Sequence, residues 1–202
     1  MEDTFTQLPL QLDPTSKAIS AAHASSSDKA MVEELNILNN LHRSLLTLDT
    51  PVPPPPVPVN PKRSAQITKL RESGNTSFRK GAYADALRMY TFGVDMALGR
   101  PPWEPAGLVR DELSGLYANR AQAHMAMQNW AEGMVDADAS VELKRVGNAK
   151  GWWRKGRCLV EMGRTEEAQE WVGRALEFEG SDADLVGLMK ELEGLLAKKT
   201  GR

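Results

Sequence analysis

The chain has 202 residues, with 25 basic and 27 acidic side chains, a formal net charge of −2 and 41% hydrophobic residues. This length allows one or two small domains, and the interspersed charges, without a basic run, give no reason to expect nucleic-acid binding. The single cysteine, Cys158, excludes an internal disulfide and fits a reducing compartment. No apolar stretch approaches the roughly 20 residues of a membrane span, and the acidic start Met1-Glu2-Asp3 is unlike a signal peptide. We therefore expect a soluble cytosolic protein that has no direct membrane insertion and reaches a membrane only through a partner.

Residues 1–50 are expected to form a small N-terminal region built around one amphipathic helix. Within residues 29–49 apolar side chains recur at every third or fourth position, which predicts a helix with one apolar stripe and with Ser27 or Asp28 as its N-cap. The stripe consists of Met31, Leu35, Leu38, Leu41, Leu45 and Leu48. An exposed stripe of this kind promotes aggregation, so we expect it to be buried, either against residues 5–24 or on another protein.

Prolines separate this region from the rest of the chain. Residues 51–62 contain seven prolines, which predicts a semi-rigid polyproline-II linker that extends by about 3.1 Å per residue. The simple interpretation of this linker is a spacer, and the alternative is a ligand for a proline-recognition domain.

The remaining residues, 63–202, contain a helical repeat. Its three copies span residues 67–100, 114–147 and 149–182. Small residues recur at fixed offsets in them: Gly74, Gly81 and Ala86 in the first, Ala121, Gly133 and Ser140 in the second, and Gly156, Gly163 and Ala168 in the third. Ala121 and Gly156 are 35 residues apart, close to the period of about 34 that is typical of the tetratricopeptide repeat, or TPR. Each copy is therefore expected to form a pair of short helices that stacks on its neighbours.

The first two copies are further apart than this period. Gly74 and Ala121 are 47 residues apart, and the excess falls in residues 99–112, where three prolines occur within five residues. Since proline cannot continue a helix, we expect a loop inserted between the first and second repeats. Residues 182–199 should form a last helix, with Ser181 as its N-cap, that closes the stack. The predicted fold is all-α: a TPR solenoid of three helix pairs with a C-terminal capping helix.

The first helices of the three pairs should line a concave groove that is rich in cations and amides. The residues expected to bind peptide carboxylates are Arg71, Asn75, Asn119, Lys150 and Arg154. Residues expected to contribute to the rest of the peptide pocket are Phe78, Gln122, Met125 and Arg157, although Phe78 and Met125 suit the core between repeats equally well. The only acidic residue expected there is Glu161, at the edge. Lys150 and Arg154 are both expected on an exposed face. Cations that lie beside amide donors suit a carboxylate ligand.

This constellation resembles the carboxylate-clamp TPR domains of chaperone cofactors. That family has Lys-x-x-x-Asn in the first repeat, Asn in the second and Lys-x-x-x-Arg in the third. This chain has Arg71-x-x-x-Asn75, Asn119 within Leu116-Tyr117-Ala118-Asn119-Arg120, and Lys150-x-x-x-Arg154. Arginine in place of the first lysine keeps the charge but changes the donor geometry. The resemblance implies binding of the C-terminal Glu-Glu-Val-Asp peptide of cytosolic heat shock protein 70 chaperones.

The layout of the whole chain resembles the small cytosolic TPR subunit of the fungal complex for post-translational translocation at the endoplasmic reticulum. The shared features are a short N-terminal helical region, a proline-containing connection, three repeats, a capping helix, and the motifs Met96-Ala97 and Pro102-Trp103-Glu104. The resemblance implies an adaptor on the cytosolic face of the endoplasmic reticulum membrane, held there by a membrane-anchored subunit, that docks chaperones. The alternative is a soluble TPR co-chaperone with no membrane partner.

Enzymatic chemistry is not expected. The histidines His23, His42 and His124 lie far apart, and the sequence has no metal-ligand cluster, phosphate-binding glycine loop or nucleophile with a nearby base. We therefore expect neither a metal nor a cofactor. His124 is expected between helices of the repeats, and Cys158 is expected to be a buried core thiol.

Overall fold

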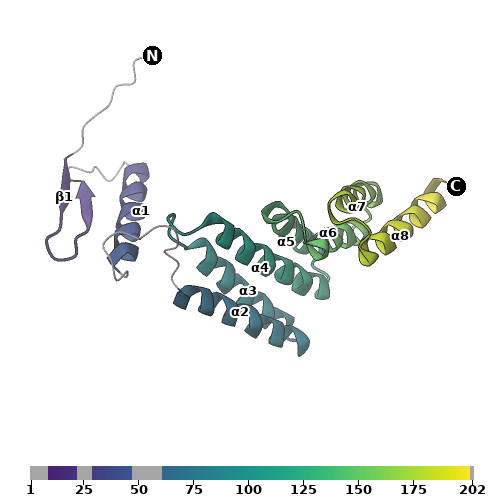
Figure 1. The fold of residues 1–202 in the computed structure, drawn as a ribbon, viewed down its shortest axis with the longest axis horizontal. Helices are drawn as coiled ribbons and strands as arrows, with labels where there is room; N and C mark the ends of the chain where they lie inside the picture. Colours follow the sequence, from purple (N-terminus) through teal and green to yellow (C-terminus); the bar gives the residue numbers. More distant parts are fainter. Residues whose placement is uncertain (1–8, 22–28, 47–60, 201–202) are drawn as a thin grey trace, which may run out of the picture. The chain divides into compact units, whose positions relative to one another are not determined.

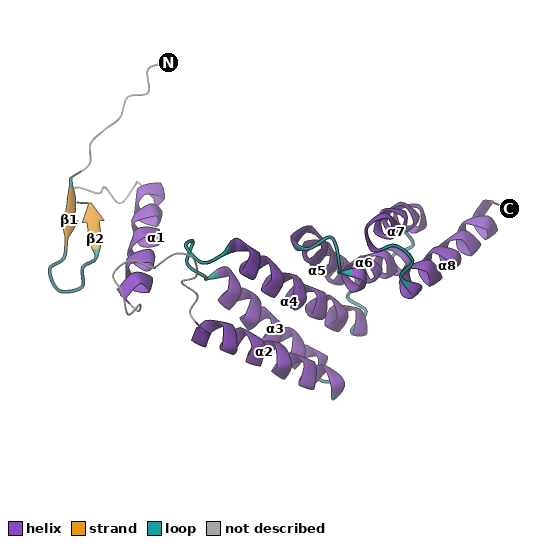
Figure 2. Cartoon of the chain, in the orientation of Figure 1, coloured by secondary structure: helices purple, strands orange, loops and turns teal. Residues whose placement is uncertain are grey.

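The structure is a computed structural model that describes residues 9–21, 29–46 and 61–200. The chain divides into two compact units, Met1–Pro58 and Val59–Arg202. The described residues contain eight helices and one two-stranded hairpin (Figures 1 and 2), which confirms the all-α prediction. None of the described helices is long and apolar enough to cross a membrane.

The described part of the first unit contains a hairpin that the sequence analysis does not predict. Strands β1 (Leu10–Leu12) and β2 (Ile19–Ala21) pair in antiparallel register. The Asp13 carboxylate accepts hydrogen bonds from the backbone amides of Thr15 and Ser16, at 2.9 and 2.6 Å, and so closes the turn. Three residues per strand give too short an alternation to distinguish a strand from a loop.

Helix α1 (Lys29–Leu46) packs on this hairpin. The Asn39 side chain accepts a hydrogen bond from the backbone amide of Ile19 at 2.7 Å and donates one to the backbone carbonyl of Ile19 at 2.9 Å. No residue of α1 is fully buried. Within the predicted stripe, Met31, Leu35, Leu41 and Leu45 are half-buried and Leu38 is exposed. Leu48 and the predicted N-cap at Ser27 or Asp28 lie outside the described residues, as does most of the predicted linker.

Seven helices form the second unit. They are α2 (Pro61–Arg79), α3 (Tyr83–Leu98), α4 (Ala106–Ala126), α5 (Trp130–Leu143), α6 (Ala149–Glu161), α7 (Thr165–Glu179) and α8 (Ala183–Thr200). Each helix packs on the next, and α2 also contacts α4, α4 contacts α6 and α6 contacts α8. Because the contacts of α2 with α4 and of α4 with α6 join the first helices of successive pairs, these three helices are neighbours along the stack.

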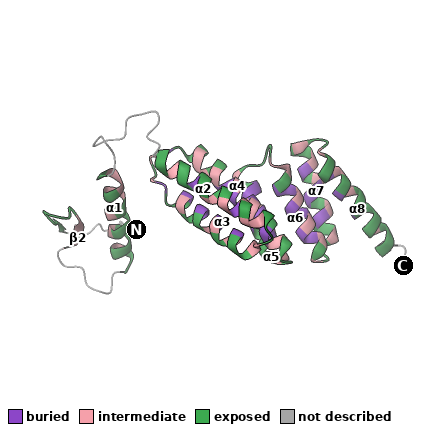
Figure 3. Ribbon diagram, turned by 90° about the horizontal axis from the view of Figure 1, so that it is seen from below, coloured by how far each residue is buried: buried purple, intermediate pink, exposed green. Residues whose placement is uncertain are grey.

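The small residues of the repeat lie where helices approach most closely. A Cβ atom on Gly74 would lie 2.4 Å from the ring of Tyr90, and one on Gly156 would lie 2.9 Å from Val172. The buried residues of the described chain accordingly lie in the helical stack and in the loop before α4 (Figure 3). Around Gly156 they form a core that includes the packed rings of Trp152 and Trp171, whose centroids are 4.3 Å apart.

The insertion between the first two pairs is shorter than predicted. The loop ends at Pro105, and α4 begins at Ala106, so half of the segment 99–112 is helical. The helix starts as soon as the prolines end, because none of the following residues interrupts it. Arg100 is buried in the loop and pairs with Glu104 and with both carboxylate oxygens of Glu112, at 2.8 Å each, which ties the loop to α4.

Two other predicted boundaries differ from the structure. Helix α2 begins at Pro61, six residues before the predicted start of the first repeat. At the capping helix, Asp182 is the residue whose carboxylate accepts hydrogen bonds from the amides of Asp184 and Leu185, at 3.1 and 3.2 Å. The prediction of Ser181 as the N-cap is therefore wrong by one residue. Serine and aspartate both suit an N-cap, so the residue type alone does not distinguish the two positions.

Candidate functional site

The first helices of the three pairs surround a polar pocket with a volume of about 440 Å³. Its lining residues are Arg71, Glu72, Asn75, Gly115, Ala118, Asn119, Asn148, Lys150 and Arg154. All five residues that the sequence analysis assigns to carboxylate binding are among them. The stacking of α2, α4 and α6 therefore brings together side chains from three separate repeats.

A chain of amide and hydroxyl groups connects the helices around this pocket. The side-chain oxygen of Asn75 on α2 accepts a hydrogen bond from the Tyr90 hydroxyl of α3 at 2.7 Å. The same oxygen accepts a second bond, at 3.0 Å, from the side-chain nitrogen of Asn119 on α4. The carboxamide of Asn75 is thus held from two sides.

Arg154 is the most unusual charge in the pocket. Its residue exposure is only 7%, so the prediction that it lies on an exposed face is wrong. Its Nη2 donates to the side-chain oxygen of Gln122 at 2.7 Å, whereas its Nη1 is buried without a hydrogen-bond partner among the described residues. Burial lowers the pKa of Arg154 to about 10, so the guanidinium is still cationic at neutral pH.

Two other shielded arginines of this fold are paired with carboxylates. Arg100 pairs with Glu104 and Glu112, as described above. Arg120 holds both carboxylate oxygens of Asp136, at 2.7 and 2.8 Å. For Arg154, no carboxylate of the described residues forms an ion pair. Because an unpaired buried charge is costly, a carboxylate from a ligand would be a favourable partner.

The other charges of the pocket are open to solvent. Arg71 and Lys150 are exposed, as predicted for Lys150. Glu72 also lines the pocket, so the expectation that Glu161 is the only acid of this surface is wrong. The pocket therefore combines three cations with one carboxylate, and it retains a positive balance.

Sequence reasoning missed Glu72, Gly115 and Asn148. Asn148 caps α6: its side-chain oxygen accepts a bond from the Gly151 amide at 3.2 Å, and its side-chain nitrogen donates to the Ser140 carbonyl at 3.1 Å. An asparagine directly before a predicted helix is an N-cap signal, so this residue could have been found. Glu72 and Gly115 carry no comparable signal.

The four residues expected in the rest of the peptide pocket do not line it. Phe78 packs against the ring of Tyr83 at 5.2 Å between centroids. Met125 lies against α5. Gln122 accepts a hydrogen bond from Arg154 but is not itself one of the lining residues. Arg157 pairs with Glu191 at 2.8 and 2.7 Å. A peptide-binding role for any of these four remains a prediction.

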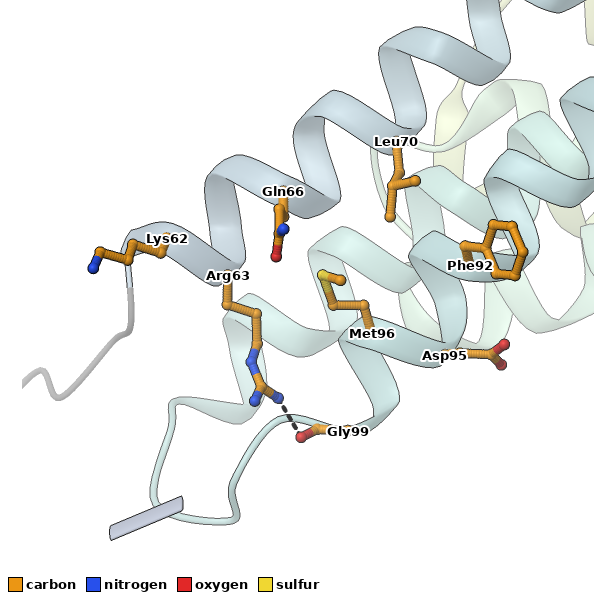
Figure 4. Close-up of a pocket in the computed structure, with 8 residues that line it drawn as sticks. All are labelled: Lys62, Arg63, Gln66, Leu70, Phe92, Asp95, Met96 and Gly99. Carbon is orange, nitrogen blue, oxygen red and sulfur yellow. Dashed lines mark hydrogen bonds between the residues drawn. The ribbon is translucent and has the colours of Figure 1, made fainter. Parts of the chain in front are cut away.

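A second hollow, of about 720 Å³, lies between α2 and α3 (Figure 4). Leu70, Phe92 and Met96 supply its apolar lining, and Arg63 donates a hydrogen bond to the backbone carbonyl of Gly99. Asp95 adds a negative charge to the basic side chains at this site. The hollow has no buried unpaired charge, and its mixed lining defines no ligand chemistry.

Cys158 and His124 have side chains of types that often act in catalysis, and both lie outside the pocket in packed positions. Cys158 is fully buried, and burial raises the pKa of its thiol to about 12, which confirms the predicted core position. His124 lies between α4 and α5, with its Nε2 3.8 Å from Asp136. Within residues 9–21, 29–46 and 61–200, no group of three His, Cys, Asp or Glu side chains could hold a metal ion.

Three helix pairs whose first helices line a shared pocket define a tetratricopeptide-repeat protein, and solved TPR domains have this fold. The first TPR of Spaghetti (RPAP3), solved with the HSP90 peptide SRMEEVD, is 27% identical with a TM-score of 0.55, covering 66% of this chain and 95% of that one. A chain of the Sec complex from S. cerevisiae is 25% identical with a TM-score of 0.68, covering 95% of this chain and 99% of that one.

The relatives in sequence give the family, although no protein-family model matches the chain. The ER protein translocation subcomplex subunit sec67 of Schizosaccharomyces pombe is 34% identical over 139 residues, which are 67% of this chain and 72% of that protein. The chain belongs to the family of this translocation subunit.

Proposed function

We propose that this protein is a non-enzymatic adaptor that binds the acidic C-terminal peptide of cytosolic heat-shock chaperones in the pocket between α2, α4 and α6. The observation that carries the proposal is Arg154, a buried guanidinium with no carboxylate partner among the described residues. A peptide carboxylate would provide the counter-charge that the fold provides for Arg100 and Arg120.

The lining of the pocket suits the end of such a peptide. A terminal aspartate carries two carboxylates, one on its main chain and one on its side chain, and each accepts several hydrogen bonds. Arg71, Lys150 and Arg154 offer charged donors and Asn75 and Asn119 offer amide donors. Charge-assisted bonds of this kind are stronger than neutral ones. The TPR of Spaghetti was solved with a peptide that ends in Glu-Glu-Val-Asp, which supports this choice of ligand.

The family of the chain supports a place for this adaptor at the endoplasmic reticulum. A protein related to a translocation subcomplex subunit, with the fold of a chain in the Sec complex, would dock chaperones where they deliver precursor proteins. We propose that a membrane-anchored subunit holds it on the cytosolic face of that membrane.

Calorimetry with the full chain tests the peptide site. A synthetic peptide ending in Glu-Glu-Val-Asp should bind with a dissociation constant of about 1–100 µM, and added salt should weaken binding because charges dominate the contact. The matched control is the same peptide with an amidated C-terminus, which lacks one carboxylate and should bind much more weakly. Equal affinity for the two peptides would contradict the proposal.

Affinity purification of the full chain from solubilised membranes tests the second half of the proposal. An integral membrane protein should be recovered in stoichiometric amount. If the peptide binds but no membrane protein is recovered, the chain acts as the alternative, a soluble TPR co-chaperone. A shortened chain, Val59–Arg202, should retain peptide binding because it contains the whole pocket. Loss of membrane recruitment in this variant would place the partner's contact on the first unit, whose helix α1 exposes Val32, Ile37, Leu38 and Leu46.

A further inference from the structure

Tyr90 is a buried tyrosine directly behind the peptide pocket. It lies on α3, with 2% of its surface exposed, and does not line the pocket. Its ring lies so close to the backbone of α2 that a Cβ atom at position 74 would be 2.4 Å away, and only glycine allows this approach. The contact brings the hydroxyl to the side-chain oxygen of Asn75 at 2.7 Å.

We infer that Tyr90 is a positioning residue of the pocket, because its hydroxyl holds the Asn75 carboxamide in the orientation that presents the side-chain nitrogen to a carboxylate. This inference rests on the proposed function. A carboxamide has a donor side and an acceptor side, and only the donor side binds a carboxylate. Tyr90 and Asn119 both donate to the oxygen of Asn75. A rotated carboxamide would lose the bond from Asn119 and would place its own N–H groups against that donor, while the Tyr90 hydroxyl holds the carboxamide in place.

The Tyr90 hydroxyl acts as the donor in its bond to Asn75. Burial raises the pKa of Tyr90, and the nearby charges of Arg154 and Arg79 oppose this rise only in part. The phenol therefore remains protonated and can act as the donor at neutral pH.

A double-mutant cycle on the full chain tests the inference, with affinity for the Glu-Glu-Val-Asp peptide as the readout. Tyr90→Phe keeps the ring and removes the hydroxyl, and it should weaken peptide binding about three- to tenfold, as expected for one hydrogen bond. In an Asn75→Ala background the same substitution should change affinity by less than about twofold, because the group that Tyr90 positions is gone. Tyr83→Phe is the matched control on α3 and should leave affinity unchanged.

The outcomes separate this inference from the proposed function. Two outcomes would overturn the inference and leave the proposed function standing, provided that the parent chain binds the peptide. In the first, the Tyr90→Phe variant binds as well as the parent. In the second, Tyr90→Phe reduces affinity as much in the Asn75→Ala background as it does in the parent. A parent chain that fails to bind the peptide would overturn both. NMR of the parent gives a second measurement that does not depend on how the variant folds. The Asn75 side-chain N–H signals should shift on peptide addition, and signals that stay in place would also overturn the inference.

Discussion

Replacing Arg154 by methionine should make the protein more stable and at the same time abolish most of its peptide affinity. Methionine keeps a long side chain among the same neighbours but removes the buried charge. Burial lowers the pKa of Arg154 from 12.5 to about 10, which corresponds to about 3 kcal/mol of unfavourable free energy for the charged form. The substitution also loses the hydrogen bond from the charged guanidinium to Gln122, which is worth about 1.5–3 kcal/mol. The expected gain in the free energy of unfolding is therefore about 1 kcal/mol.

Two measurements on the same variant test this expectation. A gain of about 1 kcal/mol should raise the melting temperature by roughly 2–4 °C for a chain of this size. Calorimetry should show peptide affinity reduced by about 1.5–3 kcal/mol, the range for a hydrogen bond to a charged group. Lys150→Met is the control: its side chain is exposed, so affinity should fall while stability changes by less than about 0.5 kcal/mol. An Arg154→Met variant that melts well below the parent and binds the peptide normally would refute the reasoning.

Two further expectations concern packing and pH. Gly74→Ala should reduce the free energy of unfolding by about 1–3 kcal/mol, because the added methyl group would lie 2.4 Å from the Tyr90 ring; urea denaturation measures this, and Gly187→Ala, with no neighbour within 4 Å, should be neutral or stabilising. His124→Gln should reduce the loss of stability between pH 7 and pH 5. Burial lowers the pKa of His124 below 6.5 despite the opposing charge of Asp136, so the unfolded chain binds the proton more readily and stability falls as the pH drops through this range. Equal pH dependence in the parent and the variant would show that His124 does not contribute.

The repeat fold can be predicted from the sequence because its two signals are spacings along the chain. One is the helical period of 3.6 residues, and the other is the repeat of small residues about every 34 positions. The start of α4 at Ala106 was not predicted, since the end of a proline-rich segment indicates where a helix becomes possible and not where it begins. The hairpin of Leu10–Leu12 and Ile19–Ala21 was missed because its pairing is a contact across the turn.

The sequence by itself determined which side chains can meet in the pocket. Once the repeats are in phase, Arg71, Asn75, Asn119, Lys150 and Arg154 must lie on the first helices, and the structure places all five around one pocket. Their role in binding a carboxylate remains a prediction, because spacing alone does not show a ligand.

Only the tertiary structure decided the environment of each of these side chains. Helical periodicity puts Lys150 and Arg154 on the same face, yet Lys150 is exposed and Arg154 is buried. The approach of Tyr90 to Asn75, and the lack of a carboxylate partner for Arg154 among the described residues, depend on how different helices pack across the stack. Burial and counter-charge are properties of these three-dimensional neighbours, and for that reason no one-dimensional pattern could have provided them.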